Sequence, residues 1–512
     1  MGCFYAIIIV MKTAQLLQLE VENLKLQLEK KDSELEKKIL KLKQKNDYIE
    51  TLEAALIELR KHRFGPRSEK VDPDQLPLFN EAEVLTDSQK ETPKPKKKKT
   101  GQRKVLPDDI PSEDKIHDLP DEQKVCPHDG TELKFIGKIK TQDFKFIPAK
   151  QIVINHIQYK YACPCCNKHV VLAKKPKKLI PKSISSPELL SYICTSKYAD
   201  GLPLYRLSVM FKRLGVKLSR QVMANWVIKC SQAIQPLVNM IRDELYNQPC
   251  VHIDETPIQV LQEAGKKATS KSYMWVQKAG SNIIYNYHPT RSAEVVEEIL
   301  ADFKGAIMTD GYKAYDGIAQ KYKIIHLGCW VHARRYFKKV LDIGENENAR
   351  HMLYLISKLY IIESRIKESG INQTQEVYNY RQKYSKPILV EIRQFLDDVL
   401  HSTTPSGKMG EALQYLHNQW HKLVVYVEDG RYPIDNNAAE NALRPFVIGR
   451  KNWLFANTPN GAHASANMYS IIETVKAHDI NPQAYLSHIF EQLPLAETVE
   501  DYENLLPWNF NI

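Results

Sequence analysis

Three acidic residues lie in settings that suit metal-dependent chemistry at phosphate. Asp254 lies in the apolar, β-branched stretch "VHIDETPIQV", where an isolated charge is costly unless something pairs with it. Asp310 follows 310 − 254 = 56 residues later in "GAIMTDGYKAY", and Glu440 another 440 − 310 = 130 residues later in "IDNNAAENALRPFVIGRKNWLF". Carboxylate oxygens are the ligands that Mg²⁺ prefers, and two such ions stabilise the attacking and leaving oxygens of an in-line displacement. Each acid alone is more often a cap or a surface charge. In the order strand, strand and helix, they predict a shared site for two Mg²⁺ or Mn²⁺ ions.

Two further acids lie close to these three in the sequence. Glu255 follows Asp254 directly, and alternation along a strand should turn its side chain to the opposite face. We therefore expect Asp254, and not Glu255, to serve the site. Asp435 precedes the helix that carries Glu440, and its place in the sequence predicts that it is the N-cap of that helix.

A mixed sheet is expected to position the acids. Three successive strands with short turns are predicted from "VHIDETPIQVL", "SYMWVQKAG" and "NIIYNYHPT", and an amphipathic helix from "SAEVVEEILADF". Two further strands begin in "GAIMTDGYKAY" and "KIIHLGCWVHARRYF". This order predicts an α/β catalytic domain of the ribonuclease H type over 248–458, with an α-helical insertion over about 346–428. Residues 459–512 are expected to form a small helical C-terminal cap.

A group of cysteines predicts a second metal site of another kind, in a small β module over 115–172. Nine cysteines in 512 residues do not make a disulfide scaffold, and three of them crowd into "CPCC". Two pairs of ligands, each pair separated by two residues, are typical of zinc sites. The expected zinc ligands are Cys126, Asp129, Cys163 and Cys166, with His128 as the alternative to Asp129. The competing interpretation is a module that folds without metal.

The N-terminal part of the chain has repeating and biased segments. Residues 13–62 carry apolar side chains every seventh position from Val21 to Leu56, which predicts a coiled coil and self-association, with a solvated single helix as the alternative. Residues 63–114 are Pro-rich and contain "PKPKKKKTGQRK", typical of a basic linker that could also contact phosphate. Residues 1–12 lack the features of a signal peptide and form a ragged start, with Met11 as an alternative first residue.

Residues 173–247 are predicted to be helical and to contain a helix-turn-helix. Two periodic helices flank a turn at Gly215 in "PLYRLSVMFKRLGVKLSRQVMANWVIKC", and Ser219 can cap the second helix. The core side of that helix would carry Val222, Trp226 and Val227. The DNA side would carry Arg220, Gln221 and Asn225. Beyond Glu440, the residues placed to meet the phosphate backbone are Arg444, Arg450 and Lys451.

The overall charge agrees with a polyanionic partner. The formal net charge is +11 and the pI is about 8.9. These values favour association with polyanions but do not predict a fold. No stretch approaches the length of a membrane span, so we expect a cytoplasmic protein without a membrane partner.

Several long motifs, in order, resemble the DDE transposases of the insertion sequence 66 family over nearly the whole chain after the first ten residues. The motifs are "RFGPRSEK", "LFNEAE", the cysteine module, "SKYADGLPLYRLS", "HIDETP", "MTDGYKAY", "GCWVHARRYF", "IDNNAAENALRPFVIGRKNWLF" and "SIIETVKAHDINPQAYL". The resemblance implies that Asp254, Asp310 and Glu440 are the catalytic triad. It also implies cleavage at the terminal inverted repeats of a mobile element and strand transfer into target DNA.

The resemblance carries further implications. It suggests a bacterial, nucleoid-associated location and small accessory proteins from the same element. The family usually has a cysteine where this chain has Asp129, which bears on zinc stoichiometry. It shares the Cys-x-x-His pair that appears here as Cys329 and His332, and this pair could support the active site. Two other functions compete: a ribonuclease H-like nuclease or resolvase without joining activity, and a catalytically silent DNA-binding regulator.

Overall fold

The computed structural model describes residues 152–162, 170–300, 302–403, 405 and 407–510, together with Lys31. The chain divides into two compact units, Val84–Lys177 and the remainder. Apart from Lys31, the predicted ragged start, coiled coil and linker over residues 1–114 lie outside the described residues, as do the expected zinc ligands Cys126, His128, Asp129, Cys163 and Cys166.

The described part of the unit Val84–Lys177 is a β-hairpin. Strand β1 (Lys160–Ala162) pairs antiparallel with β2 (Val170–Leu172). The ladder continues in a hydrogen bond of 3.0 Å from the backbone N–H of Ala173 to the carbonyl oxygen of Tyr159. The two strands therefore flank the segment 163–169, which carries one pair of the expected zinc ligands.

Four helices begin the described part of the other unit: α3 (Pro187–Tyr198), α4 (Leu204–Arg213), α5 (Arg220–Ala233) and α6 (Gln235–Tyr246). Gly215, with φ of +87°, lies in the turn between α4 and α5, where a side chain would be strained. The hydroxyl of Ser219 accepts a hydrogen bond of 3.3 Å from the backbone N–H of Val222. The predicted turn and N-cap of the second helix are confirmed.

The sheet of this unit is mixed, as the sequence predicts. Its order is β5-β4-β3-β6-β7, antiparallel between β3, β4 and β5 and parallel between β3, β6 and β7. The strands are β3 (Cys250–Gln259), β4 (Lys271–Ala279), β5 (Asn282–His288), β6 (Ala306–Thr309) and β7 (Ile325–Gly328). Helix α7 (Ala293–Leu300) connects β5 to β6, and α8 (Ala314–Tyr322) connects β6 to β7.

Side chains of α14 (Pro459–Ala477) hydrogen-bond with the edge strand β5. The backbone N–H groups of Ile283 and Tyr285 donate to the hydroxyls of Thr474 and Ser470 at 3.0 and 2.7 Å. These groups face away from β4 and would otherwise be buried without a partner. Helix α14 therefore seals this edge of the sheet.

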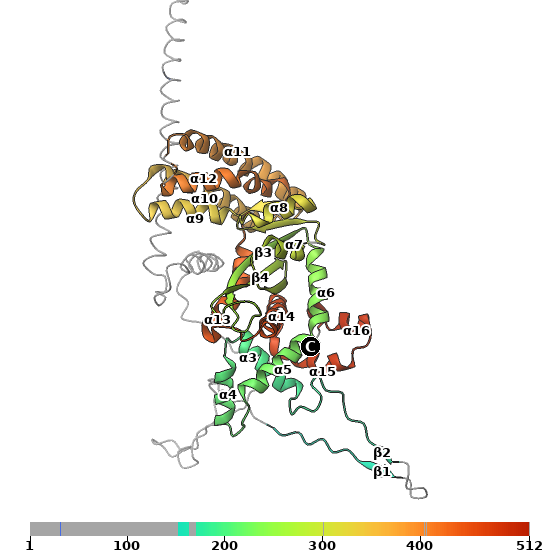
Figure 1. Cartoon of the computed structure of the whole chain (residues 1–512). Coiled ribbons are helices and arrows are strands. Elements are labelled where there is room, and N and C mark those ends of the chain that lie inside the picture. Colours follow the sequence, from blue (N-terminus) through green and yellow to red (C-terminus); the bar gives the residue numbers. More distant parts are fainter. Residues whose placement is uncertain are drawn as a thin grey trace, which may run out of the picture. The chain divides into compact units, whose positions relative to one another are not determined.

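A helical layer follows β7, as predicted for the inserted region. It consists of α9 (Trp330–Leu341), α10 (Glu347–Glu368), α11 (Thr374–Leu400) and α12 (Lys408–Leu423), which Figure 1 shows grouped together. Arg381 on α11 is only 4% exposed and binds Glu363 on α10 at 2.7 Å. Its Nη1 also donates to the carbonyl oxygens of Tyr426, Asp429 and Tyr432, which fixes the segment that leads back to the sheet.

The chain returns through α13 (Asn437–Trp453) and ends in α14, α15 (Pro482–Gln492) and α16 (Val499–Asn504). Helix α15 packs on α3, and one buried apolar cluster runs from α3–α6 through the sheet to these last helices. Within the described ranges, every helix falls short of the length and apolar character that a membrane crossing needs.

Candidate active site

Asp254 and Asp310 lie at the same level of two neighbouring parallel strands. β3 and β6 pair with His252 opposite Met308, so two residues further along each strand bring Asp254 opposite Asp310. β6 ends at Thr309, and Gly311, with φ of +94°, turns the chain away immediately after Asp310. Asp310 therefore lies just past the end of β6, beside the stretch of β3 that carries Asp254.

Glu255 joins these two acids. One carboxylate oxygen from each of Asp254, Glu255 and Asp310 lies within 4.8 Å of the others. The expectation that Glu255 points away from the site is wrong. Alternation sets only the face on which a side chain leaves the strand, and Asp310, just past the end of β6, joins both Asp254 and Glu255. The Tyr315 hydroxyl donates to Oε2 of Glu255 at 3.0 Å.

Burial and mutual repulsion set the electrostatics of the acid cluster. Burial raises the pKa of Asp254 well above its usual range, and the neighbouring Glu255, Asp310 and Glu440 raise it further. Burial and Asp310 raise the pKa of Glu255 to about 7, although Arg291 and Tyr315 oppose this. Acids held together at such a cost favour a bound cation, and their oxygen ligands suit a hard divalent ion.

Arg291 supplies positive charge at this cluster. Its guanidinium pairs with Glu255 and lies 3.6 Å from Oδ2 of Asp310. It also stacks over the ring of Tyr312, with 3.9 Å from Cζ to the ring centre, and the Tyr312 hydroxyl donates to the Arg291 carbonyl oxygen at 2.5 Å. Arg291 lies in the loop before α7 and was not among the predicted site residues.

Glu440 lies beside this cluster and not within it. Its side chain is 3% exposed, and its Oε2 accepts a hydrogen bond of 2.6 Å from Arg335 on α9. Its Oε1 is 3.9 Å from Nε2 of His332 and has no hydrogen-bond partner among the described residues. A buried carboxylate oxygen without a hydrogen-bond partner among the described residues is suited to bind a cation.

Asn436 connects the strand of Asp254 to the helix of Glu440. It is fully buried; its Nδ2 donates to the carbonyl oxygen of Ile253 at 2.9 Å, and its Oδ1 lies 3.1 Å from Nδ1 of His252. The backbone N–H of Asn436 donates to the sulfur of Cys329 at 3.2 Å. Cys329 is thereby a structural support at the start of α9.

The expectation that Asp435 is the N-cap of this helix is wrong by one residue. The N-cap is Asn436, whose side chain is committed to β3. Asp435 instead accepts a hydrogen bond of 3.1 Å from the backbone N–H of Asn437, and burial raises its pKa to about 6.

In the part of the chain that the structure describes, Cys329 and His332 do not join any group of three that could share a metal ion.

The predicted recognition helix α5 shows its polar side to solvent. Arg220, Gln221 and Asn225 are exposed. The expectation that Val222 is in the core is wrong: it is 38% exposed, and Met223 is buried in its place. The buried side chains of α5 follow helical spacing: Met223, Trp226, Val227, Cys230 and Ser231.

The three basic residues of α13 have different surroundings. Nη1 of Arg450 donates to the hydroxyl of Thr256 at 3.1 Å and to the carbonyl oxygen of Pro257, so this side chain supports β3. Arg444 is half-buried, and Lys451 is exposed.

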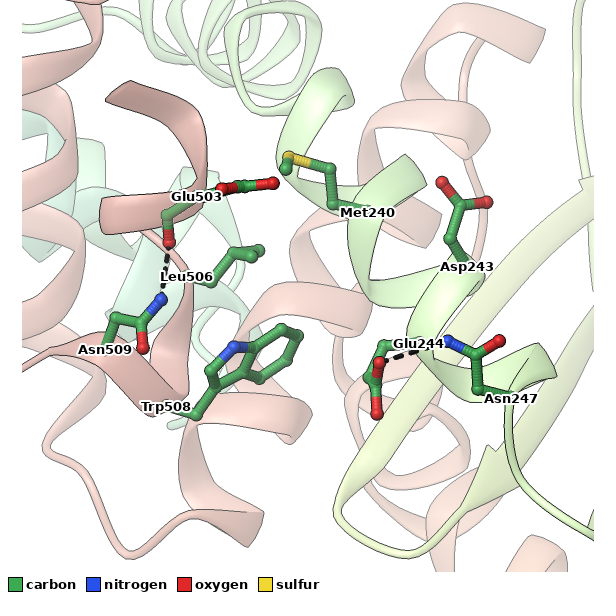
Figure 2. Close-up of a pocket in the computed structure, with 8 residues that line it drawn as sticks. All are labelled: Met240, Asp243, Glu244, Asn247, Glu503, Leu506, Trp508 and Asn509. Atoms are coloured by element: carbon green, nitrogen blue, oxygen red, sulfur yellow. Dashed lines mark hydrogen bonds between the residues drawn. The ribbon is translucent and has the colours of Figure 1, made fainter. Parts of the chain in front are cut away.

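A pocket lies between α6 and the C-terminal residues, away from all these residues. Asp243 and Glu244 on one side face Glu503 and Trp508 on the other (Figure 2). None of its lining residues belongs to the predicted site, and its acids disfavour phosphate.

Four family models match the chain. Residues 182–464 match "Transposase IS66 family", and residues 470–508 match "IS66 C-terminal element". Residues 123–167 match "zinc-finger binding domain of transposase IS66", a range that includes all the expected zinc ligands. Residues 51–114 match "Transposase C of IS166 homeodomain", which spans the end of the predicted coiled coil and the predicted linker.

Curated relatives come from Sinorhizobium fredii. The uncharacterized protein y4qI is 29% identical over 505 residues, which covers 91% of this chain and 90% of the relative. The uncharacterized protein y4hP is 28% identical over 498 residues, covering 90% and 89%. The similarity extends over nearly the full length of both.

Proposed function

The chain belongs to the IS66 family of transposases, with that family's zinc-finger region, and from this premise we propose that it cuts DNA at the ends of its element and joins the freed 3′-hydroxyl to target DNA. The observation that carries the proposal is the parallel register that sets Asp254 and Asp310 at one level, with Glu440 buried beside them.

The order of the elements supports a ribonuclease H-like catalytic domain. The first acid lies on β3, the second directly after the adjacent parallel strand β6, and the third on α13, after the helical insertion. An arrangement of this kind lets three acids from distant parts of the chain meet at one edge of a sheet.

The residues present fit a pair of Mg²⁺ or Mn²⁺ ions. The Glu440 oxygen without a hydrogen-bond partner among the described residues, and the strained proximity of Asp254 and Asp310, are what divalent cations would relieve. Asp254, Asp310 and Glu440 would hold the ions, which would activate the attacking oxygen and stabilise the leaving one.

Other residues of the chain orient this site. Asn436 fixes β3 against the start of α13, and the Tyr415 hydroxyl holds the carbonyl oxygen of Asp310 at 3.0 Å. Arg291 and Arg335 balance the acids' charge. When the ions bind, Arg335 would be released from Glu440 and Arg291 from its attraction to Asp310, while Arg291 would stay paired with Glu255. Both guanidinium groups could then attract a phosphate.

DNA recognition is assigned to the zinc module and to the exposed side of α5. Phosphate contacts position a protein on DNA, whereas contacts to base edges specify sequence. We assign Arg220, Gln221 and Asn225 to the terminal inverted repeats and Lys451 to the backbone near the active site. Two further partners remain predictions from the sequence. The chain would associate with itself through residues 13–62, and it would contact small accessory proteins of the element.

Strand transfer separates this proposal from its competitors. The full-length protein, Mg²⁺, a duplex with the element's own end and a supercoiled target plasmid should yield joined products. Hydrolysed ends without joining would instead identify a nuclease or resolvase. Binding without cleavage would identify a regulator.

A further inference from the structure

The end of α13 contains a strained turn centred on Leu454. Leu454 has φ of +66° and ψ of −51°, and the backbone N–H of Phe455 donates to the carbonyl oxygen of Trp453 at 2.9 Å. These values define a γ-turn of the rare positive-φ kind. A leucine is poorly suited to this conformation because its Cβ crowds the backbone, so the surrounding structure must impose it.

Contacts on both sides of the turn impose this conformation. The backbone N–H of Leu454 donates to the carbonyl oxygen of Arg450 at 2.7 Å, which ends the helix. On the other side Ala456 donates to Gln259 at 3.0 Å and accepts from Leu261 at 3.1 Å, so the chain pairs with the end of β3. The turn is therefore held between the two elements that carry Glu440 and Asp254.

The side chains at this turn are apolar and exposed. Leu454 is 64% exposed and Phe455 is 42% exposed, whereas the neighbouring Ala456 is buried. A strained backbone that holds a leucine and a phenylalanine in solvent has no evident role in stability. Strain of this kind is concentrated at functional sites.

Positive charge and location point to DNA as the partner. Lys451 is exposed one turn before the Leu454–Phe455 turn. Figure 1 shows α13 next to α3, between β3 and α4. Leu454 follows Glu440 by 454 − 440 = 14 residues, all but the last of them in α13, so the two lie roughly 21 Å apart along the helix at 1.5 Å per residue. At 3.4 Å per base step that is about six base pairs from the acids.

We propose that Leu454 and Phe455 form a wedge that inserts against the bases of the element's end. This inference rests on the proposed function, because it needs DNA that runs from the acids toward α3–α5. Apolar side chains that enter a base step unstack it and kink the duplex, and adjacent cations hold the backbone on either side. The wedge would distort the DNA about six base pairs from the scissile phosphate.

The test uses the full-length protein and a duplex of the element's end with 2-aminopurine at successive positions, because the fluorescence of this base rises on unstacking. Wild type should raise the fluorescence at one or two positions. Leu454→Gly should abolish the rise and weaken binding roughly tenfold, as expected for the loss of an apolar side chain inserted at a base step. The same variant should unfold at a higher Tm, because glycine adopts positive φ without strain. Phe455→Ala should reduce the rise while Tm stays near that of wild type.

Two controls separate the wedge from other effects. Asp479→Gly also replaces an exposed residue with positive φ, in the loop before α15, and should leave the fluorescence unchanged. Ile361→Ala removes an apolar side chain that is 46% exposed on α10 and should do the same.

Each contrary outcome has its own meaning. Strand transfer by wild type without any fluorescence rise overturns the wedge and leaves the proposed function intact. Unchanged fluorescence with Leu454→Gly, together with a lower molecular mass by light scattering, identifies a contact between protein chains and overturns the wedge. Failure of wild type to bind the duplex or to transfer strands overturns both proposals.

Discussion

The side-chain amide of Asn436 donates a hydrogen bond of 2.9 Å to the carbonyl oxygen of Ile253, the residue before Asp254. The bond crosses 183 residues of sequence and joins the strand of one acid to the N-cap of the helix that carries another. The spacing between Asp254 and Glu440 therefore depends on an uncharged side chain that contacts neither carboxylate in this bond.

Replacing Asn436 tests this connection. Asn436→Ala leaves the Ile253 carbonyl oxygen buried without its donor and should lower the free energy of unfolding by about 1–3 kcal/mol. Strand transfer should fall further than DNA binding, because the acids lose their spacing. Urea unfolding and strand-transfer assays measure the two effects, with the exposed Asn441→Ala as the matched control. Equal activity in the two variants would contradict the positioning role.

We expect the acidic residues to differ in how strongly each one contributes to strand transfer. Asp254→Asn, Asp310→Asn and Glu440→Gln each remove a charge with little change in shape, so DNA binding should persist while strand transfer falls on the order of a thousandfold. Asp435→Asn should be mild, because an asparagine oxygen can still accept from Asn437. An active Glu440→Gln variant would mean that the third ligand lies elsewhere.

Glu255 should have an intermediate effect. Its carboxylate lies within the acid cluster, but its oxygens already pair with Arg291 and Tyr315. Such a residue changes the metal affinity of its neighbours without itself being a ligand. Glu255→Gln should weaken Mn²⁺ binding about tenfold, measured by calorimetry on the protein without DNA. Affinity as low as that of Asp254→Asn would make Glu255 a ligand.

Asp316 gives a pH dependence that is independent of the metal site. Burial alone would raise its pKa, but hydrogen bonds from His326 and Lys422 lower it to about 2. A depressed pKa in the folded protein stabilises the fold above the unfolded value near 4, and this contribution is lost as the pH falls from about 4 to about 2. The Tm difference between wild type and Asp316→Asn should therefore shrink over this range. Because Asp316 is partly exposed, added salt should reduce the difference at neutral pH.

The zinc module makes a prediction about stoichiometry. Protein purified without chelator should contain one zinc per chain, and the occupancy should fall on mild acidification because thiolates become protonated. Asp129→Cys should retain the ion to lower pH than wild type, since a fourth thiolate binds zinc more strongly than a carboxylate. Absence of zinc in wild type by elemental analysis would refute the site.

The element order was predictable from sequence because periodicity and local capping act over a few residues. Ser219 illustrates this, since an N-cap needs only its own helix. Glu255 was not predictable, because alternation sets only the face on which a side chain leaves the strand. It does not account for Asp310, which lies just past the end of β6 and joins both Asp254 and Glu255. Arg291 and Asn436 could not be identified because their partners lie on other elements and leave no local pattern. Val222 was predicted to be buried instead of Met223 because the predicted apolar face of the helix was displaced by one residue.

The distance in sequence between β3 and α13 also governs when the protein can become active during synthesis. Glu440 is made 440 − 254 = 186 residues after Asp254, which at 5–20 residues per second takes roughly 10–40 s. Until then β3 can pair with β4, but Asn436 has not yet been added and the third acid is missing. A nascent chain, or one that ends within the helical insertion, therefore lacks the complete set of acids and should be unable to cut DNA.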